Sequence, residues 1–204
     1  MSTWLIIRAS GLVAYGLLAA STIWGLLLST RLLGRKAPSR ALTFTHEGLS
    51  LGALAALITH LVGVALDDYI GFGWLEVLIP GAATWRPQAT ALGVVGAWSM
   101  VVVGLSFYVR RFIGQKAWRY LHFGAFGAYA AATAHGVMAG SDTAHPVVLT
   151  MYLATGVSVL VLVAARVTLS GGRSGSRPAP SARPAARSER PPSGAARPAP
   201  APEG

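Results

Sequence analysis

The amino-acid sequence predicts an all-α integral membrane protein, a bundle of five transmembrane helices with its N-terminus outside and its C-terminus in the cytoplasm. The first observation behind this prediction is composition: of 204 residues, 53% are hydrophobic and only 12% are charged. Soluble domains carry about 25% charged residues, so most of this chain is expected to face lipid. The mean hydropathy of +0.52 agrees with that expectation.

The second observation is the length of the apolar stretches. A helix needs about 20 residues to cross a hydrocarbon core of about 30 Å, and backbone polar groups in lipid must be hydrogen-bonded within the helix. The first stretch is too long for a signal peptide and lacks a convincing cleavage site, so we expect it to be retained. The expected spans are residues 4–30, 42–67, 89–109, 118–140 and 146–168.

The third observation is the distribution of charge between the spans, which sets the orientation because cytoplasmic loops are rich in Lys and Arg. The first and third connections and the end of the last span hold Arg31, Arg35, Lys36, Arg40, Arg110, Arg111, Lys116, Arg119 and Arg166. The second and fourth connections hold Asp67, Asp68, Glu76 and Asp142, opposed by Arg86. The N-terminus is therefore expected outside, and the aromatic connection 68–88 is expected in the outer headgroup zone.

The net charge of +10 does not indicate a nucleic-acid partner here, because no basic run with interleaved aromatic residues lies on a soluble helix. Part of the charge lies in residues 171–204, which are rich in Arg, Pro, Ala, Ser and Gly and contain no aromatic residue. Such a segment cannot bury enough apolar surface to order itself, so we expect a disordered cytoplasmic tail. The absence of cysteine excludes disulfides, iron–sulfur clusters and thiolate chemistry.

Four of the five histidines lie inside expected spans, where ionisable residues are costly and often functional. His46 and His60 lie on the second span, and His122 and His135 lie on the fourth, which runs in the same direction. The offsets of 14 and 13 residues correspond to about 21 and 20 Å, so the four residues form two pairs at matching depths. Two level pairs of neutral imidazoles are what two haems with axial histidine ligands require.

The surroundings of the histidines give further expectations. The second ring nitrogen of each is expected to donate to a nearby polar group or to the carbonyl four residues earlier, on Leu42, Ala56, Trp118 or Ala131. Thirteen residues turn a helix about 140° away from the starting face, so the fourth span is expected to be overwound or kinked near Gly124 or Gly127. Glycines near the ligands leave room for a flat group or allow close helix packing: Gly48, Gly52, Gly63, Gly124, Gly127 and Gly136.

Residues 109–143, VRRFIGQKAWRYLHFGAFGAYAAATAHGVMAGSDT, resemble the ferric reductase-like transmembrane domain family, which includes NADPH oxidases and the haem subunit of the bacterial methionine sulfoxide reductase system. The matching residues are Trp118, Arg119, His122, His135, Gly136 and the Gly140–Ser141–Asp142 turn. Residues 43–61 look like the family's other histidine-bearing helix, and the resemblance covers residues 5–168. It implies two b-type haems, the inner one on His46 and His122 and the outer one on His60 and His135.

The resemblance also implies a function in a bacterial-type cell membrane. The chain would relay electrons from a separate cytosolic flavin- or NAD(P)H-linked donor, which supplies any flavin, to an acceptor at the outer face. One alternative is an oxidoreductase that itself reduces ferric chelates or oxygen at the outer haem. A second alternative is a transporter without haem that uses the histidines as a proton relay.

Three other polar residues each have two possible roles. Arg8 either contacts a propionate of the outer haem or extends to the interface, and Arg119 has the same choice at the inner pair. Glu47 either tunes His46 or faces the cytoplasmic interface. His145 is expected to be a solvated loop residue, and no catalytic residue is assigned.

Overall fold

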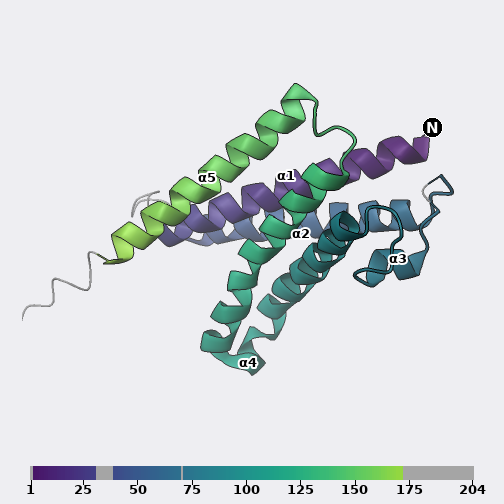
Figure 1. Ribbon diagram of the computed structural model, residues 1–204. Helices are drawn as coiled ribbons and strands as arrows, with labels where there is room; N and C mark the ends of the chain where they lie inside the picture. The colour runs from purple at the N-terminus through teal and green to yellow at the C-terminus, as the bar shows by residue number, and fades with distance from the viewer. Residues whose placement is uncertain (1, 31–38, 70, 172–204) are drawn as a thin grey trace, which may run out of the picture.

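The computed structural model describes residues 2–30, 39–69 and 71–171 and is all-helical over them, as the composition predicts. The expected tail, residues 172–204, and the basic residues of 31–38 lie outside the described residues. The helices are α1 (Ser2–Thr30), α2 (Ser39–Ala65), α3 (Trp74–Leu78), α4 (Pro87–Ala139) and α5 (Pro146–Gly171), shown in Figure 1.

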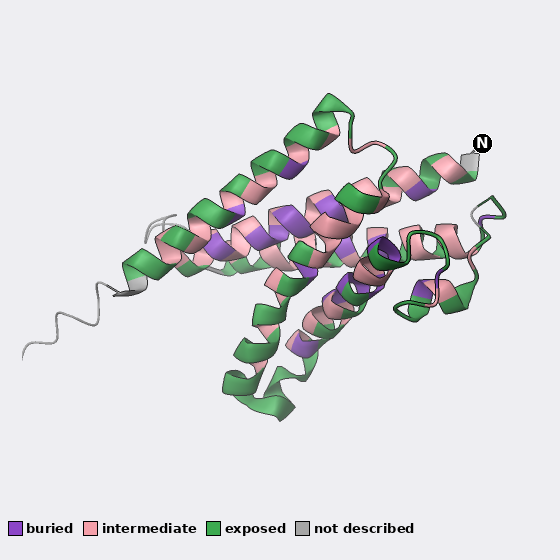
Figure 2. Cartoon of the chain, viewed as in Figure 1, coloured by how far each residue is buried: buried purple, intermediate pink, exposed green. Residues whose placement is uncertain are grey.

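Four helices, α1, α2, α4 and α5, are long and apolar enough to cross a membrane. Large apolar side chains cover their outer faces, with Leu160 71% exposed and Ile58 60% exposed. Figure 2 shows the buried residues gathered where the helices cross. Apolar patches of this extent suit lipid and not water, so the chain is a multi-pass membrane protein.

The helix α4 is a hairpin and not a single rod. Its 53 residues would extend about 80 Å if straight, at about 1.5 Å per residue. Gly114 breaks it with φ 80 and ψ 155, and the two arms, residues 87–113 and 115–139, then lie side by side (Figure 1). Gly96 of the first arm faces Ala131 of the second, and Gly124 faces Val103.

This hairpin changes the expected connection between the third and fourth spans. The sequence predicts a basic loop between residues 109 and 118, whereas the structure has helix up to and after Gly114. Arg110, Arg111, Lys116 and Arg119 therefore lie on the exposed ends of the two arms. The arms correspond to the third and fourth expected spans.

The core lies around α1, which packs antiparallel to α2 and is also covered by α4 and α5. Ile7 near the start of α1 meets Gly63 near the end of α2, and Trp24 Nε1 donates to the Leu42 carbonyl at 2.9 Å. Small residues at these contacts let membrane helices approach closely. One buried cluster comprises Ala14, Leu18, Ala53, Leu57, Ala97, Met100 and Ala128; a second comprises Tyr15, Ala19, Leu26, Tyr129, Tyr152 and Val159.

The aromatic connection between α2 and α4 contains α3 and packs across one end of the bundle, which we call the α3 end. Trp4 and Tyr69 meet edge to face at 6.3 Å, and Phe72 and Trp85 do so at 6.4 Å. Trp98 Nε1 donates to the Leu78 carbonyl at 2.9 Å. These contacts tie the connection to α1 and to the first arm of α4.

The turn at Gly114 predicts a glycine-specific effect. Its dihedral angles fall where residues with a Cβ are strained by about 1–3 kcal/mol, so Gly114→Ala is expected to lower the free energy of unfolding in detergent by about that amount. Gly127→Ala on the second arm is the matched control, because an added Cβ there meets nothing within 4 Å. Equal stabilities of the two variants would contradict this account of the turn.

Candidate functional site

His46 is held in one tautomer by a short chain of hydroxyl groups between α1 and α2. Ser50 Oγ donates to the His46 carbonyl at 2.9 Å, so it must accept the 2.7 Å bond from Ser21 Oγ. Ser21 has then used its only proton and accepts from His46 Nδ1 at 3.2 Å. His46 Nδ1 therefore carries a hydrogen, and Nε2 is the ring nitrogen left to bind another group.

His60 and His135 each have Nδ1 bonded to a backbone carbonyl of a neighbouring helix. His60 Nδ1 lies 2.9 Å from the Ile7 oxygen on α1, and His135 Nδ1 lies 2.8 Å from the Ala89 oxygen on the first arm of α4. A carbonyl can only accept, so each Nδ1 carries the hydrogen. Imidazoles that donate Nδ1–H to a backbone carbonyl in this way are typical of metal-ligating histidines.

Three of the four rings rest against glycines on a neighbouring helix. A Cβ added to Gly11 would lie 3.0 Å from the His60 ring, one added to Gly25 would lie 3.1 Å from the His46 ring, and one added to Gly93 would lie 2.6 Å from His135 Nδ1. The bare backbone at these positions is what admits the imidazoles. These glycines and Ser21 are site residues that the sequence interpretation missed.

A sequence signal for two of these glycines exists. Gly11 and Gly25 are as far apart as His46 and His60, and antiparallel helices of equal rise keep such a register over their full contact. Equal glycine and histidine spacing on adjacent spans therefore marks the two places where α1 receives an imidazole.

His46 and His122 form the first expected pair. Their ring centroids lie 6.0 Å apart with the planes at 78°. Metal–imidazole bonds of about 2 Å, plus about 1 Å from each nitrogen to its ring centroid, separate the centroids of two ligands on opposite sides of a metal by about 6 Å. The observed separation therefore fits one metal ion between the two rings.

His60 and His135 form the second expected pair. They line one cavity of about 230 Å³ and lie close enough to interact electrostatically. The cavity is mostly apolar, with walls from α1, α2, both arms of α4 and the connection around α3. A largely apolar space lined by two imidazoles suits a flat hydrophobic group that needs axial nitrogen ligands.

One finer expectation is narrowed and another is corrected. Of the two partners expected for the second ring nitrogens, His46, His60 and His135 use a nearby polar group, on Ser21, Ile7 and Ala89, and not the carbonyl four residues earlier. In each case a neighbouring helix offers an acceptor within hydrogen-bond distance of the ring nitrogen. Gly124 and Gly127 keep helical dihedral angles, so the break in α4 lies at Gly114 instead.

The glycines expected near the ligands mainly serve helix packing. Gly52 faces Leu17, Gly63 faces Ile7 and Gly124 faces Val103. Gly136 receives the Tyr152 hydroxyl, and an added Cβ at Gly48 or Gly127 meets nothing within 4 Å. The glycines that contact the imidazoles are on the helices that carry no ligand at that level.

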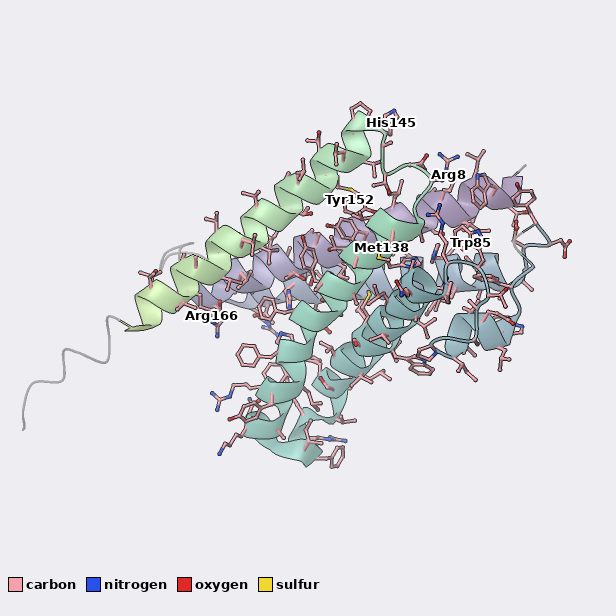
Figure 3. All side chains as sticks on the ribbon, viewed as in Figure 1. Arg8, Trp85, Met138, His145, Tyr152 and Arg166 are labelled. Carbon is pink, nitrogen blue, oxygen red and sulfur yellow. The ribbon has the colours of Figure 1, made fainter. Side chains whose placement is uncertain are left out.

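Arg8 lines the cavity of His60 and His135 and is bonded to a carboxylate of the chain itself. Its Nε donates to Asp142 Oδ2 at 2.7 Å and its Nη2 donates to Asp142 Oδ1. Figure 3 shows Arg8 near Trp85 and Met138 at the α3 end, and Trp85 and Asp142 line the same cavity. His145 is exposed in the turn before α5, as expected, and Arg119 is also exposed.

Comparisons of this chain with protein-family models, with curated proteins and with solved structures gave no match.

The glycine contacts predict the cost of one methyl group. Gly93→Ala places a Cβ against His135 Nδ1, and overpacking of this kind costs about 1–3 kcal/mol. We expect a lower melting temperature in detergent than for Gly16→Ala, a control on α1 with open space at its Cβ. A Gly93→Ala protein as stable as the control would show that His135 does not rest on this backbone.

The Arg8–Asp142 pair predicts a measurable but small coupling. Because the side chains are 36% and 25% exposed, solvent screens the pair and we expect a coupling energy of about 0.5–1 kcal/mol. It is measured by a double-mutant cycle of Arg8→Met and Asp142→Asn on unfolding free energy. The same cycle with Asp68→Asn should give no coupling, and no difference between the cycles would refute the pair.

Proposed function

We propose that this chain is a transmembrane dihaem b-type cytochrome that relays electrons across a cell membrane. The observation that carries the proposal is the geometry of the histidines: two pairs at different depths, Nδ1 bonds from three of the rings to neighbouring helices, and a centroid separation of 6.0 Å in the pair His46–His122. Each haem would supply a redox iron with four porphyrin nitrogens and two open axial positions.

The chain's own residues would hold both groups rigidly. His46 and His122 would ligate the inner iron, and His60 and His135 the outer one. Ser21, the Ile7 carbonyl and the Ala89 carbonyl fix the direction of three of these rings. Two protein histidines at each haem would favour electron transfer over the binding of a substrate.

The charges support a topology with five crossings, the N-terminus outside and the C-terminus in the cytoplasm. Each arm of α4 is long enough to cross alone. Asp67, Asp68, Glu76 and Asp142 all lie at the α3 end, whereas Arg40, Arg166 and the basic residues beside Gly114 lie at the opposite helix ends. By the positive-inside rule the α3 end faces outward.

This orientation determines which redox partner would meet each end of the bundle. The inner pair would receive electrons from a separate cytosolic flavin- or NAD(P)H-linked protein, and the outer pair would pass them to an acceptor at the α3 end. The resemblance of residues 109–143 to ferric reductase-like domains supports this direction and a bacterial-type cell membrane. Arg8 could serve a propionate of the outer haem only by sharing its guanidinium with Asp142.

Haem content tests the proposal directly. The purified protein should contain two haems with reducible Soret and α bands. His46→Ala, His60→Ala, His122→Ala and His135→Ala should each lose one haem, because a ligand of one iron is removed. His145→Ala is the matched control and should keep both.

The opposite outcomes are equally clear. A wild-type protein without a reducible haem spectrum would refute the cytochrome and favour a histidine relay for protons. Unchanged haem content in one of the four variants would refute the assignment of that ligand.

A further inference from the structure

The indole of Trp118 carries a buried hydrogen-bond donor without a partner. Its Nε1 is inaccessible to solvent, and among the described residues no group accepts from it. Other tryptophans are satisfied: Trp24 Nε1 donates to the Leu42 carbonyl and Trp98 Nε1 to the Leu78 carbonyl. A buried indole N–H normally finds an acceptor, so this donor points to a group that binds beside it.

Trp118 lies next to the inner histidine pair. Its ring stacks on His122 with centroids 5.1 Å apart and an interplanar angle of 26°, and His122 in turn lies 6.0 Å from His46. Trp118 is one helical turn closer to Gly114 than His122. The unpaired donor therefore belongs to a ring that contacts one member of the inner histidine pair, on the side of the α4 turn.

The chemistry of the donor limits what it can bind. An indole N–H only donates, so its partner must offer an acceptor atom. The only oxygen atoms of a b-type haem belong to the two propionate carboxylates, and a charged acceptor makes the stronger bond. We propose that Trp118 Nε1 donates a hydrogen bond to a propionate of the inner haem; this rests on the proposed function.

The bond would set the orientation of the inner haem in its site. It directs the carboxylate edge toward the end of α4 near Gly114, where Arg110, Arg111, Lys116 and Arg119 concentrate positive charge without a carboxylate between Glu76 and Asp142 in the sequence. This is the cytoplasmic side in the proposed topology. The carboxylate edge would thus face the side from which the electron donor approaches.

The experiment uses the full-length, haem-loaded protein in detergent. Trp118→Phe removes the donor and keeps an aromatic ring against His122. We expect one of the two haems to be lost to excess apomyoglobin about tenfold faster than in wild type, because a bond to a charged group is removed. The propionate bending band in the resonance Raman spectrum should shift, and the midpoint potential of one haem should fall, because the less compensated carboxylate stabilises ferric iron.

Trp98→Phe is the matched control, since it removes an indole N–H that is bonded to a carbonyl at the α3 end. It should leave haem loss, Raman band and both potentials unchanged. If Trp118→Phe does not fold, benzothienylalanine at position 118 replaces only the N–H by sulfur and is expected to give the same shifts.

The outcomes separate the two proposals. A wild-type protein that binds no haem refutes the cytochrome itself. A protein that binds two haems, and whose Raman band and haem loss are the same in wild type and in the folded variant at position 118, refutes the role of Trp118 and leaves the cytochrome intact.

Discussion

The antiparallel contact between α1 and α2 is the interaction on which the rest of the structure depends. An imidazole in a membrane helix must both fit between backbones and satisfy its ring N–H, because lipid offers no hydrogen-bond partner. α1 meets both needs twice: Gly25 and Ser21 receive His46, and Gly11 and the Ile7 carbonyl receive His60. A shift of α1 by one residue along α2 would break both arrangements together, since they share one register.

In the hairpin of α4, too, one helical arm carries the histidines and the other contacts one of them. Its second arm carries His122 and His135, and its first arm supplies Gly93 and the Ala89 carbonyl that receive His135. The register of the hairpin, with Gly93 opposite His135 and Gly124 opposite Val103, brings the small buried Ser106 level with His122. Each histidine-bearing helix is therefore packed against one that positions at least one of its rings. In the proposed cytochrome, rings held in this way would favour electron transfer, because their surroundings are organised in advance.

Properties that are local along the chain could be predicted from the sequence, and properties of helix packing could not. Hydropathy and helical rise are sufficient to find the helices and to pair His46 with His122. The partners of the ring nitrogens belong to other helices, so Ile7 and Ala89 depend on a register that a single span does not reveal. The turn at Gly114 was expected to be a longer loop because its basic flanks resemble one, yet one glycine with positive φ is enough to reverse the chain.

The two arginines at the α3 end, Arg8 and Arg86, are both bonded to groups at or just after the end of the second arm of α4. Arg8 is held by Asp142, directly after α4. Arg86 donates to the Met138 carbonyl at the end of α4 and lies over the Trp85 ring at 4.9 Å. The end of a helix carries partial negative charge and unbonded carbonyls, so both arginines are compensated by the end of the second arm. Both arginines therefore hold this arm, with His135 one turn inside it, against α1 and the first arm.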